Sequence, residues 1–499
     1  METINRREFI GTAAAVAAAA VVPRHVLGRG FVAPSDKINV GLIGCGTQAL
    51  HMIWDYLRND NIRITSVCDC NRNSQDYPEW GRFSMRNDIR RNLNEPDYGA
   101  EDTGCRCGRE VGQYIVETFY RKKFGKASWE GLGVYEDFRD MLADEKNLDG
   151  VWVMTPDHSH GVIAYKALTA GKHVIMHKPL SNIIAESRIL AKTAEETGLA
   201  THMYCAAGSA VRPTLREWID AGAVGKVYEV HNWSRRPVWP QGMQAPTDTP
   251  PIPDGFNWDL WLGPAEERPF HPAYTHTCFR GWYDFGAGAL GDMGHYSGFQ
   301  IWHILDLHLP VSVEASASEF CRINETGQAE KVKNRDSYPQ ASLVHWEFPA
   351  RGKKPPVDFY WYDGGLRPTL WKEMEKEGIE MPDEGLLFVG DKGKIFADFT
   401  GGNARVIPEK AGKKFTPPPQ RLPRPEDELT QWIRACRGEK PSDARFQVVQ
   451  PITETLLLGG IAVRVPGKLR WDAETMKVTN KDEANQYVTR KNRKGWELA

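Results

Sequence analysis

The sequence predicts an α/β protein in which a domain built on a parallel sheet precedes an α+β domain with mainly antiparallel strands. Three observations predict it. Strand and helix patterns alternate between residues 37 and 204, strand-like alternation recurs between residues 311 and 361, and 499 residues exceed what one hydrophobic core usually serves. We therefore expect domains at residues 35–205 and 206–499, preceded by residues 1–34, which stay outside the fold.

Residues 1–34 have the pattern of an export signal and linker. Arg6 and Arg7 precede an alanine-rich run, residues 11–22, that is too short and too weakly apolar to span a bilayer. This order of charge and apolar residues resembles a twin-arginine signal, which exports a folded protein. We expect a periplasmic protein without a membrane anchor after processing; the alternative is a chance arginine pair before an alanine helix.

The first predicted strand, Lys37–Ile43, runs directly into a glycine turn. Gly44, Gly46 and Ala49 give the pattern G-x-G-x-x-A, with Thr47 and Gln48 between. The first glycine allows a tight turn, the second lets a pyrophosphate approach the backbone, and the alanine lets the next helix pack closely on the strand. That helix, residues 49–57, offers free N–H groups and the positive end of its dipole to a phosphate. The pattern predicts a Rossmann dinucleotide-binding domain.

The second predicted strand, Ile62–Val67, ends close to Asp69. An acidic side chain at this position binds the ribose diol and repels a 2′-phosphate. We therefore predict NAD as the cofactor and keep NADP as the alternative, because Arg72 lies nearby.

Residues 71–131 interrupt the alternation with a long polar stretch, which we interpret as an insertion with a helix of its own at Val111–Phe124. It could form a lid over the cofactor or an oligomer contact. Two C-x-C pairs, Cys68/Cys70 and Cys105/Cys107, could form a four-thiolate site or two bridges. Because C-x-C is tighter than the usual zinc spacing and Cys68 falls within a strand, we predict no metal site.

The alternation resumes after the insertion. The patterns predict helices at 135–142, 162–168 and 184–197 and strands at 151–154, 173–176 and 200–204. The strand before Thr155-Pro156 and the strand that leads into His177-Lys178-Pro179 belong to one βαβ unit. Lys178 therefore lies at the carboxyl end of a parallel strand, where open α/β sheets bind ligands. This makes Lys178 a candidate catalytic residue; the alternative is a solvated surface lysine.

Five segments together resemble the Gfo/Idh/MocA oxidoreductase family. They are GLIGCGTQA at 41–49, TPDHSH at 155–160, AGKHVIMHKPL at 170–180, WIDAGAVGKV at 218–227 and GALGDMGH at 288–295. The likeness covers nearly the whole chain outside the export segment and the insertion. It implies a Rossmann domain joined to a C-terminal domain with a large open sheet, and oxidation or reduction of hydroxyls on sugars and cyclitols.

In that family the lysine of an E-K-P motif and a D-x-x-x-H pair line the site, and this sequence departs from both. His177 replaces the glutamate before Lys178, and Asp292 is followed by His295, with Tyr296 at the strict histidine position. We prefer His295, with a one-residue shortening, as the proton acceptor and keep Tyr296 as the alternative. Beside the glycine turn and Asp69, the predicted nucleotide contacts are Thr155, Pro156, His160, His177 and Lys178.

The loops between residues 233 and 285 suit a sugar independently of the resemblance. Aromatic and basic side chains alternate there, and a sugar has apolar ring faces and hydroxyl edges. The candidate substrate residues are Arg235, Trp239, His276, Arg280 and Trp282. The alternative, equally weighted, is that these aromatic residues fill a core under the loops.

The predicted function is an NAD(P)-dependent oxidoreductase that transfers a hydride from or to a secondary hydroxyl of a sugar, glycoside or cyclitol. In this hypothesis His295 takes the proton, Lys178 donates to the oxygen, and Asp292 orients either the histidine or a neighbouring hydroxyl. Two alternatives stay open: a glycoside hydrolase that uses NAD for transient oxidation, and a non-catalytic sugar-binding protein with a structural nucleotide. A formal net charge of −2 with interspersed signs gives no indication of a nucleic-acid partner. We expect a homo-oligomer, and a tightly bound nucleotide because the periplasm has no comparable pool.

Overall fold

The computed structural model describes residues 36–79, 81–125, 131–332 and 334–498. The predicted export segment, residues 1–34, lies outside these residues.

The N-terminal domain is built on a six-stranded parallel sheet with the order β5-β2-β1-β6-β7-β8. Both faces are covered, so its central strands are near-continuous apolar runs. The predicted Rossmann alternation is confirmed. Its elements are β1 (Ile38–Ile43), α2 (Thr47–Arg58), β2 (Ile62–Cys68), β5 (Gly133–Tyr135), α5 (Phe138–Asp144), β6 (Gly150–Val153), α6 (Asp157–Thr169), β7 (His173–His177), α7 (Ile184–Thr197) and β8 (Thr201–Tyr204).

The segment after β2 differs from the predicted insertion in its extent. β3 (Ser74–Tyr77) pairs with β4 (Cys105–Cys107), and α3 (Ser84–Leu93) lies between them in the chain. The predicted helix is present as α4 (Arg109–Phe124), but it packs against β2 and leads into β5. α4 is therefore the crossover helix of the Rossmann sheet itself, and the extra segment ends before it.

The C-terminal domain is built on a nine-stranded mixed sheet with the order β17-β16-β15-β9-β14-β13-β10-β18-β19. Only the β14–β9 pair is parallel, so the expected large, mainly antiparallel sheet is confirmed. Its strands are β9 (Val227–Trp233), β10 (Ser312–Ala317), β13 (Ser342–Phe348), β14 (Val357–Tyr362), β15 (Gly385–Gly390), β16 (Gly393–Ala397), β17 (Arg405–Ile407), β18 (Leu469–Asp472) and β19 (Lys477–Val478).

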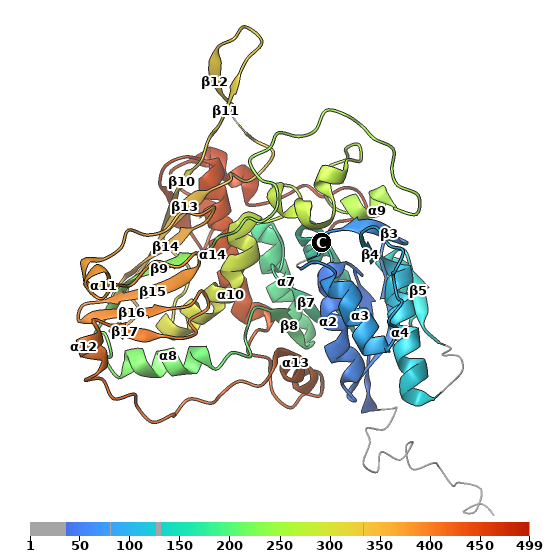
Figure 1. Ribbon diagram of the computed structural model, residues 1–499, viewed down its shortest axis with the longest axis horizontal. Helices are drawn as coiled ribbons and strands as arrows, with labels where there is room; N and C mark the ends of the chain where they lie inside the picture. The colour runs from blue at the N-terminus through green and yellow to red at the C-terminus, as the bar shows by residue number, and fades with distance from the viewer. Residues whose placement is uncertain (1–35, 80, 126–130, 333, 499) are drawn as a thin grey trace, which may run out of the picture.

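Two long helices, α10 (Gly288–Leu305) and α14 (Phe446–Arg464), lie between the two sheets, with α7 beside α14 (Figure 1). Within the described residues α14 is long and apolar enough to cross a membrane, but 72% of it is buried inside the protein, as in a core helix. The other α-helices of this half are α8 (Val211–Asp220), α9 (Trp258–Leu262), α11 (Lys372–Lys376), α12 (Glu409–Gly412) and α13 (Glu428–Cys436).

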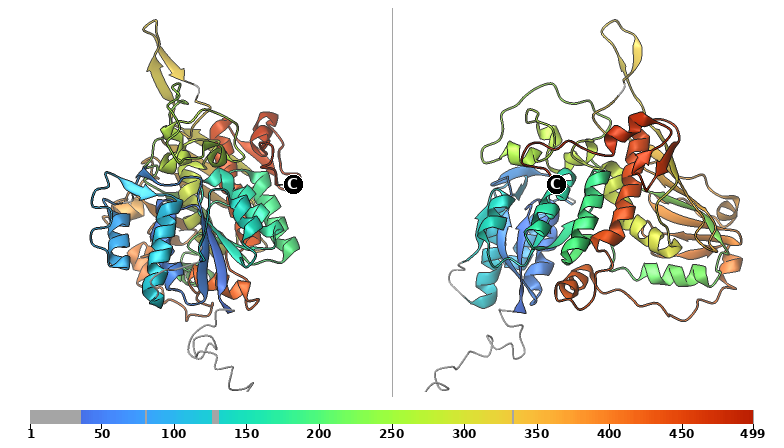
Figure 2. Two further views of the ribbon diagram at one scale, coloured as in Figure 1. Left: turned by 90° about the vertical axis from the view of Figure 1, so that its right-hand side faces the viewer. Right: turned by 180° about the vertical axis from the view of Figure 1, so that it is seen from behind.

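A hairpin and the chain end complete the fold. The hairpin of β11 (Phe320–Ile323) and β12 (Ala329–Val332) projects from the body beyond β10 (Figure 2). The C-terminal tail returns to the first domain, where Trp496 packs on Phe138. α13 likewise packs on β8. The two domains are therefore held together by segments far apart in sequence.

An ion pair with a buried carboxylate joins α7 to α14. Glu454 is fully buried and accepts hydrogen bonds from both Nε and Nη2 of Arg188, at 2.7 and 2.6 Å. We expect Arg188→Ala to lower the free energy of unfolding by about 3 kcal/mol, because it leaves a buried carboxylate without its cation. Lys192→Ala, which removes an exposed pair on the same helix, is expected to cost about 0.5 kcal/mol or less. Denaturant unfolding measures both, and equal losses would contradict the assignment.

Candidate active site

A cleft of about 1130 Å³, including the part open to solvent, lies at the carboxyl ends of β1, β2, β6 and β7. Open parallel sheets bind ligands at the carboxyl ends of their strands, next to the point where the strand order reverses, which here lies between β1 and β6. Of the predicted residues, the structure places these eleven along it: Gly44, Gly46, Thr47, Gln48, Asp69, Thr155, Pro156, His177, Lys178, His276 and Arg280.

The glycine turn fits a dinucleotide pyrophosphate. Gly44 has a φ of +96°, and a Cβ there would lie 2.7 Å from the backbone of Met154, so only glycine fits. α2 begins directly after Gly46, and no side chain caps its first N–H groups. A phosphate bound at a helix N-terminus accepts hydrogen bonds from these N–H groups. Ala49 is buried beneath the turn, where its small side chain allows the close approach of helix and strand.

Asp69 follows β2 and borders the same cleft. Its carboxylate accepts hydrogen bonds from the backbone N–H of Cys45, at 2.6 Å, and of Asn71, at 2.8 Å. Burial raises the pKa of this carboxyl, and the two N–H donors oppose the shift. Arg72 was predicted to contact the nucleotide, but it does not line the cleft. Its guanidinium instead binds Asp254 at 3.0 Å, because the backbone of Arg72 pairs with the loop that carries this aspartate.

A strap from the inserted segment crosses the cleft beside the glycine turn. The ring of Tyr77 lies so near Gly46 that a Cβ there would meet it at 3.3 Å, and Thr47 Oγ1 donates to the carbonyl of Pro78 at 2.9 Å. The ring of His276, from the C-terminal domain, lies tilted against that of Tyr77, with ring centres 3.7 Å apart, and pairs with Asp76 at 3.0 Å. The hydrogen bond from His276 holds the pKa of Asp76 down at about 2. We call Asp76, Tyr77 and His276 the latch.

Lys178 lies in a buried charge cluster. It is 3% exposed and donates to Oδ1 of Asp292, the same atom that accepts from Nε of Arg280 at 3.0 Å. Burial alone would raise the pKa of Asp292, but the two cations outweigh it and hold that pKa below its ordinary value. Burial lowers the pKa of Lys178, and Asp292 partly offsets this. The cluster gives the cleft a fixed cation beside a fixed carboxylate.

His295, the preferred proton acceptor, lies away from the cleft, and Tyr296, the alternative, lies beside the charge cluster. Both ring nitrogens of His295 are engaged away from the cleft, with Gly291 O at 2.6 Å and Thr453 Oγ1 on α14 at 3.1 Å. Burial lowers the pKa of His295 to about 3. Tyr296, one turn after Asp292, faces the cluster instead: the Lys178 ammonium lies 5.2 Å from its ring centre. The strict four-residue spacing after Asp292 is thus kept, with a tyrosine.

His160 holds the cleft together without lining it. It is buried between the carbonyls of Pro179, at 2.7 Å, and Thr155, at 2.8 Å, so it joins the ends of β6 and β7. Burial lowers the pKa of this imidazole to about 4. His160 was predicted to contact the nucleotide. In the structure it instead bridges two backbone carbonyls and so fixes the backbone next to Lys178.

The predicted sugar residues separate into two groups. His276 and Arg280 border the cleft, and Trp239 lies next to it, 5.6 Å under the guanidinium of Arg280. Trp282 is 2% exposed, donates to Ala273 O and belongs to an aromatic core under the loops, as the alternative held. Arg235 is mostly exposed and points toward Glu384. Trp282 and Arg235 are therefore removed from the candidate substrate residues.

Several cleft residues were not identified from the sequence, among them Asp157, Tyr77 and Trp496. Asp157 accepts a hydrogen bond from the backbone N–H of Ala287, and burial raises its pKa to about 6. Its position shortly after a strand could have identified it. Tyr77 lies in the insertion and Trp496 in the C-terminal tail, and no local pattern marks either.

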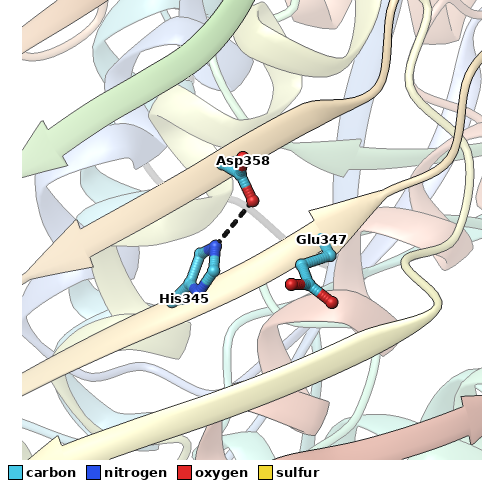
Figure 3. A group of neighbouring side chains, drawn as sticks. All are labelled: His345, Glu347 and Asp358. Carbon is cyan, nitrogen blue, oxygen red and sulfur yellow. Dashed lines mark hydrogen bonds and ion pairs between the residues drawn. The ribbon is translucent and has the colours of Figure 1, made fainter.

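A second group of potential ligands lies on the open face of the large sheet, outside the cleft. The ligand atoms of His345, Glu347 and Asp358 lie within 4.8 Å of one another (Figure 3). Each already has a partner: His345 bonds Asp358 at 2.8 Å and Glu314 at 3.3 Å, and Glu347 accepts from Lys468. Ion pairs across the sheet thus account for this group. The described cysteines are all free thiols, and no group of potential metal ligands among the described residues contains one.

Comparison with known proteins gives matches over both domains. Residues 116–205 match the NAD-binding Rossmann fold of the Gfo/Idh/MocA oxidoreductase family, and residues 219–334 match the family's C-terminal alpha/beta domain. The WlbA dehydrogenase of Bordetella pertussis, solved with NADH and UDP-GlcNAcA, has a similar fold: TM-score 0.53 at 15% identity, over 87% of this chain and 99% of that one.

Two curated relatives match shorter segments. A dTDP-3,4-didehydro-2,6-dideoxy-alpha-D-glucose 3-reductase of Streptomyces violaceoruber is 33% identical over 105 residues, which is 21% of this chain and 29% of the relative. A glycosyl hydrolase family 109 protein of Shewanella sp. (strain ANA-3) is 27% identical over 174 residues, 34% of this chain and 28% of the relative. The chain thus spans less than a third of either relative. Residues 116–205 and 219–334 therefore carry, in order, the two domains of the Gfo/Idh/MocA oxidoreductase family.

Proposed function

We propose that this protein is an NAD-dependent oxidoreductase that acts on a secondary hydroxyl of a sugar, glycoside or cyclitol. The observation that carries the proposal is Lys178, which is paired with the buried Asp292 and lines the cleft that also contains the glycine turn and Asp69. The relatives named above that act on sugar substrates support the substrate class. Incubation of the purified protein with a panel of glycosides, followed by mass spectrometry of the products, tests it.

The residues of the cleft have distinct tasks in this reaction. The nicotinamide ring, when bound, accepts or returns the hydride. Lys178 donates a hydrogen bond to the hydroxyl oxygen and stabilises the alkoxide that develops as the carbon–hydrogen bond breaks. Asp292 holds the ammonium in place, and Arg280 fixes the carboxylate, because Lys178 and Arg280 both donate to Oδ1 of Asp292. The glycine turn, the N-terminus of α2 and Asp69 are the groups that would hold the nucleotide.

We expect the nucleotide to be NAD(H) rather than NADP(H). Asp69 would repel a 2′-phosphate, and Arg72, the cation that could offset this, binds Asp254 instead. Mass spectrometry of the nucleotide released on denaturation measures this directly. A released nucleotide with the mass of NADP would overturn the assignment.

We further propose that the nucleotide stays bound and is recycled in place. Arg6 and Arg7 support export of the folded protein, after which a lost cofactor could not be replaced. The latch supports retention, because it joins the two domains across the cleft and covers the glycine turn with Tyr77. Alternate oxidation and reduction of two sugars would then regenerate the cofactor. Cell fractionation tests the periplasmic location.

NAD-assisted glycoside hydrolysis is the second candidate. Its support is the similarity to the family 109 hydrolase, which is limited to a third of this chain. Both reactions begin with hydride abstraction, so the same cleft serves either. Release of the aglycone without a second sugar substrate would favour hydrolysis.

We propose that the open face of the large sheet joins copies of this chain. On β13 and β14 the side chains alternate between the core and this face, where Tyr360 stacks against His345 at 4.3 Å and against His231 at 4.9 Å. Light scattering of the purified protein measures the number of copies.

A further inference from the structure

Two neighbouring side-chain contacts join the end of β7 to the helix α10. Lys178 bonds Asp292, and the preceding residue, His177, bonds Tyr296 one turn further along the helix: His177 Nε2 and Tyr296 Oη lie 3.2 Å apart. Asp292 and Tyr296 share a helix face because they are four residues apart. The two positions at which the sequence departs from the family motifs are therefore in direct contact with each other.

We propose that Tyr296 and His177 form a proton relay for the reaction proposed above, with Tyr296 as the catalytic residue and His177 as its partner. When a sugar hydroxyl is oxidised, its hydride leaves from carbon and its O–H bond breaks. The proton passes to Tyr296 Oη while the phenolic proton passes to Nε2 of His177. In reduction each proton moves in the opposite direction. His177 lines the cleft, so its proton exchanges with water there.

The geometry supports this assignment in two ways. The ammonium of Lys178 lies over the ring of Tyr296, so an oxygen held by Lys178 is brought to the side of α10 that carries the phenol. His295, the competing acceptor, has both nitrogens occupied by Gly291 and Thr453.

The protonation states fit a relay. Burial raises the pKa of Tyr296 and lowers that of His177, so near neutral pH the phenol carries its proton and the imidazole is neutral. The charged or titratable groups around the pair are Lys178, Arg280 and Asp292 in the cluster, His160 beside β7, Tyr204 and Cys205 at the end of β8, and Glu428 on α13.

A set of three matched variants tests the relay. Tyr296→Phe keeps the ring and removes the acceptor, His177→Gln keeps a hydrogen-bonding group that cannot take a proton, and His177→Glu provides a carboxylate of the same shape that can. The probes are methyl glucoside, methyl galactoside, N-acetylglucosamine and myo-inositol, and the signal is the absorbance of the protein-bound nucleotide in a single turnover. Tyr204→Phe, which removes a hydroxyl bonded to Tyr56 outside the cleft, is the control.

We expect Tyr296→Phe and His177→Gln each to slow the single turnover by about 10²-fold, in the range of a general acid–base group. The double variant should be no slower than either, because the residues act as a unit. His177→Glu should recover most of the rate. The solvent isotope effect on the single turnover should show that two protons move in the wild-type protein and only one in His177→Gln. Nucleotide content and thermal unfolding, measured on the same samples, separate a loss of proton transfer from a loss of cofactor or of fold.

Two results would overturn the relay but not the proposed function. The first is a near-normal rate in Tyr296→Phe. The second is that the losses of Tyr296→Phe and His177→Gln add in the double variant while His177→Glu is as slow as His177→Gln. If no probe changes the nucleotide absorbance of the wild-type protein, the proposed function falls, and the relay falls with it.

Discussion

Lys178→Met should slow turnover by about 10²-fold or more while the nucleotide stays bound. Methionine keeps the length of the side chain but removes the donor to the developing alkoxide, and loss of one such donor typically costs this much. Arg280 still pairs with Asp292 in the variant, so the cluster does not leave a buried charge alone. Single-turnover kinetics measure the rate, and the nucleotide released on denaturation measures occupancy.

Lys172→Met is the matched control for this variant. Lys172 directly precedes β7, and Lys178 directly follows it. Lys172 donates to the carbonyl of Leu148 outside the cleft. Its replacement should leave turnover unchanged. A near-normal rate in Lys178→Met would remove Lys178 from the reaction, and an equal loss in Lys172→Met would attribute the effect to the fold.

Tyr77→Ala should weaken nucleotide binding by about tenfold. The ring covers the glycine turn and supports His276, and aromatic contacts of this kind contribute about 0.5–1.5 kcal/mol, of which 1.4 kcal/mol corresponds to a tenfold change in Kd. Fluorescence titration of nucleotide-free protein gives the Kd, and dialysis followed by denaturation shows how much nucleotide the wild type and the variant keep.

Tyr98→Ala tests whether the effect is specific to the latch. Tyr98 lies in the same inserted segment but stacks on Tyr114, away from the cleft. Its removal should leave the Kd within about twofold of wild type, in the range of changes far from a ligand. An unchanged Kd in Tyr77→Ala would exclude the latch as the cause of retention.

The sequence predicted the Rossmann alternation and the cleft because both depend on local patterns. The period of apolar residues marks the strands, and Gly44 must have a positive φ whatever packs around it. Lys178 was found in the same way, from its place at the end of a predicted strand. These features need no knowledge of what lies across the domain interface.

Features that depend on distant packing were not predictable in this way. Positions three and four after Asp292 lie on either side of the same helix face, and only the packing of α14 decides that His295 turns away and Tyr296 turns toward Lys178. The alternation of aromatic and charged residues near Trp282 is equally compatible with a sugar site and with a core. Trp496 reaches the cleft from the end of the chain, where no local pattern indicates it.

The most direct test of the proposed oxidoreductase is the near-ultraviolet absorbance of dialysed protein incubated with sugars and no added nucleotide. The proposal predicts that a sugar alcohol or glycoside from the panel produces the band of reduced nicotinamide, that a second sugar removes it, and that Lys178→Met shows neither change. A filtrate without nucleotide after denaturation, from protein that remains inert when NAD is added with every sugar tested, would contradict it.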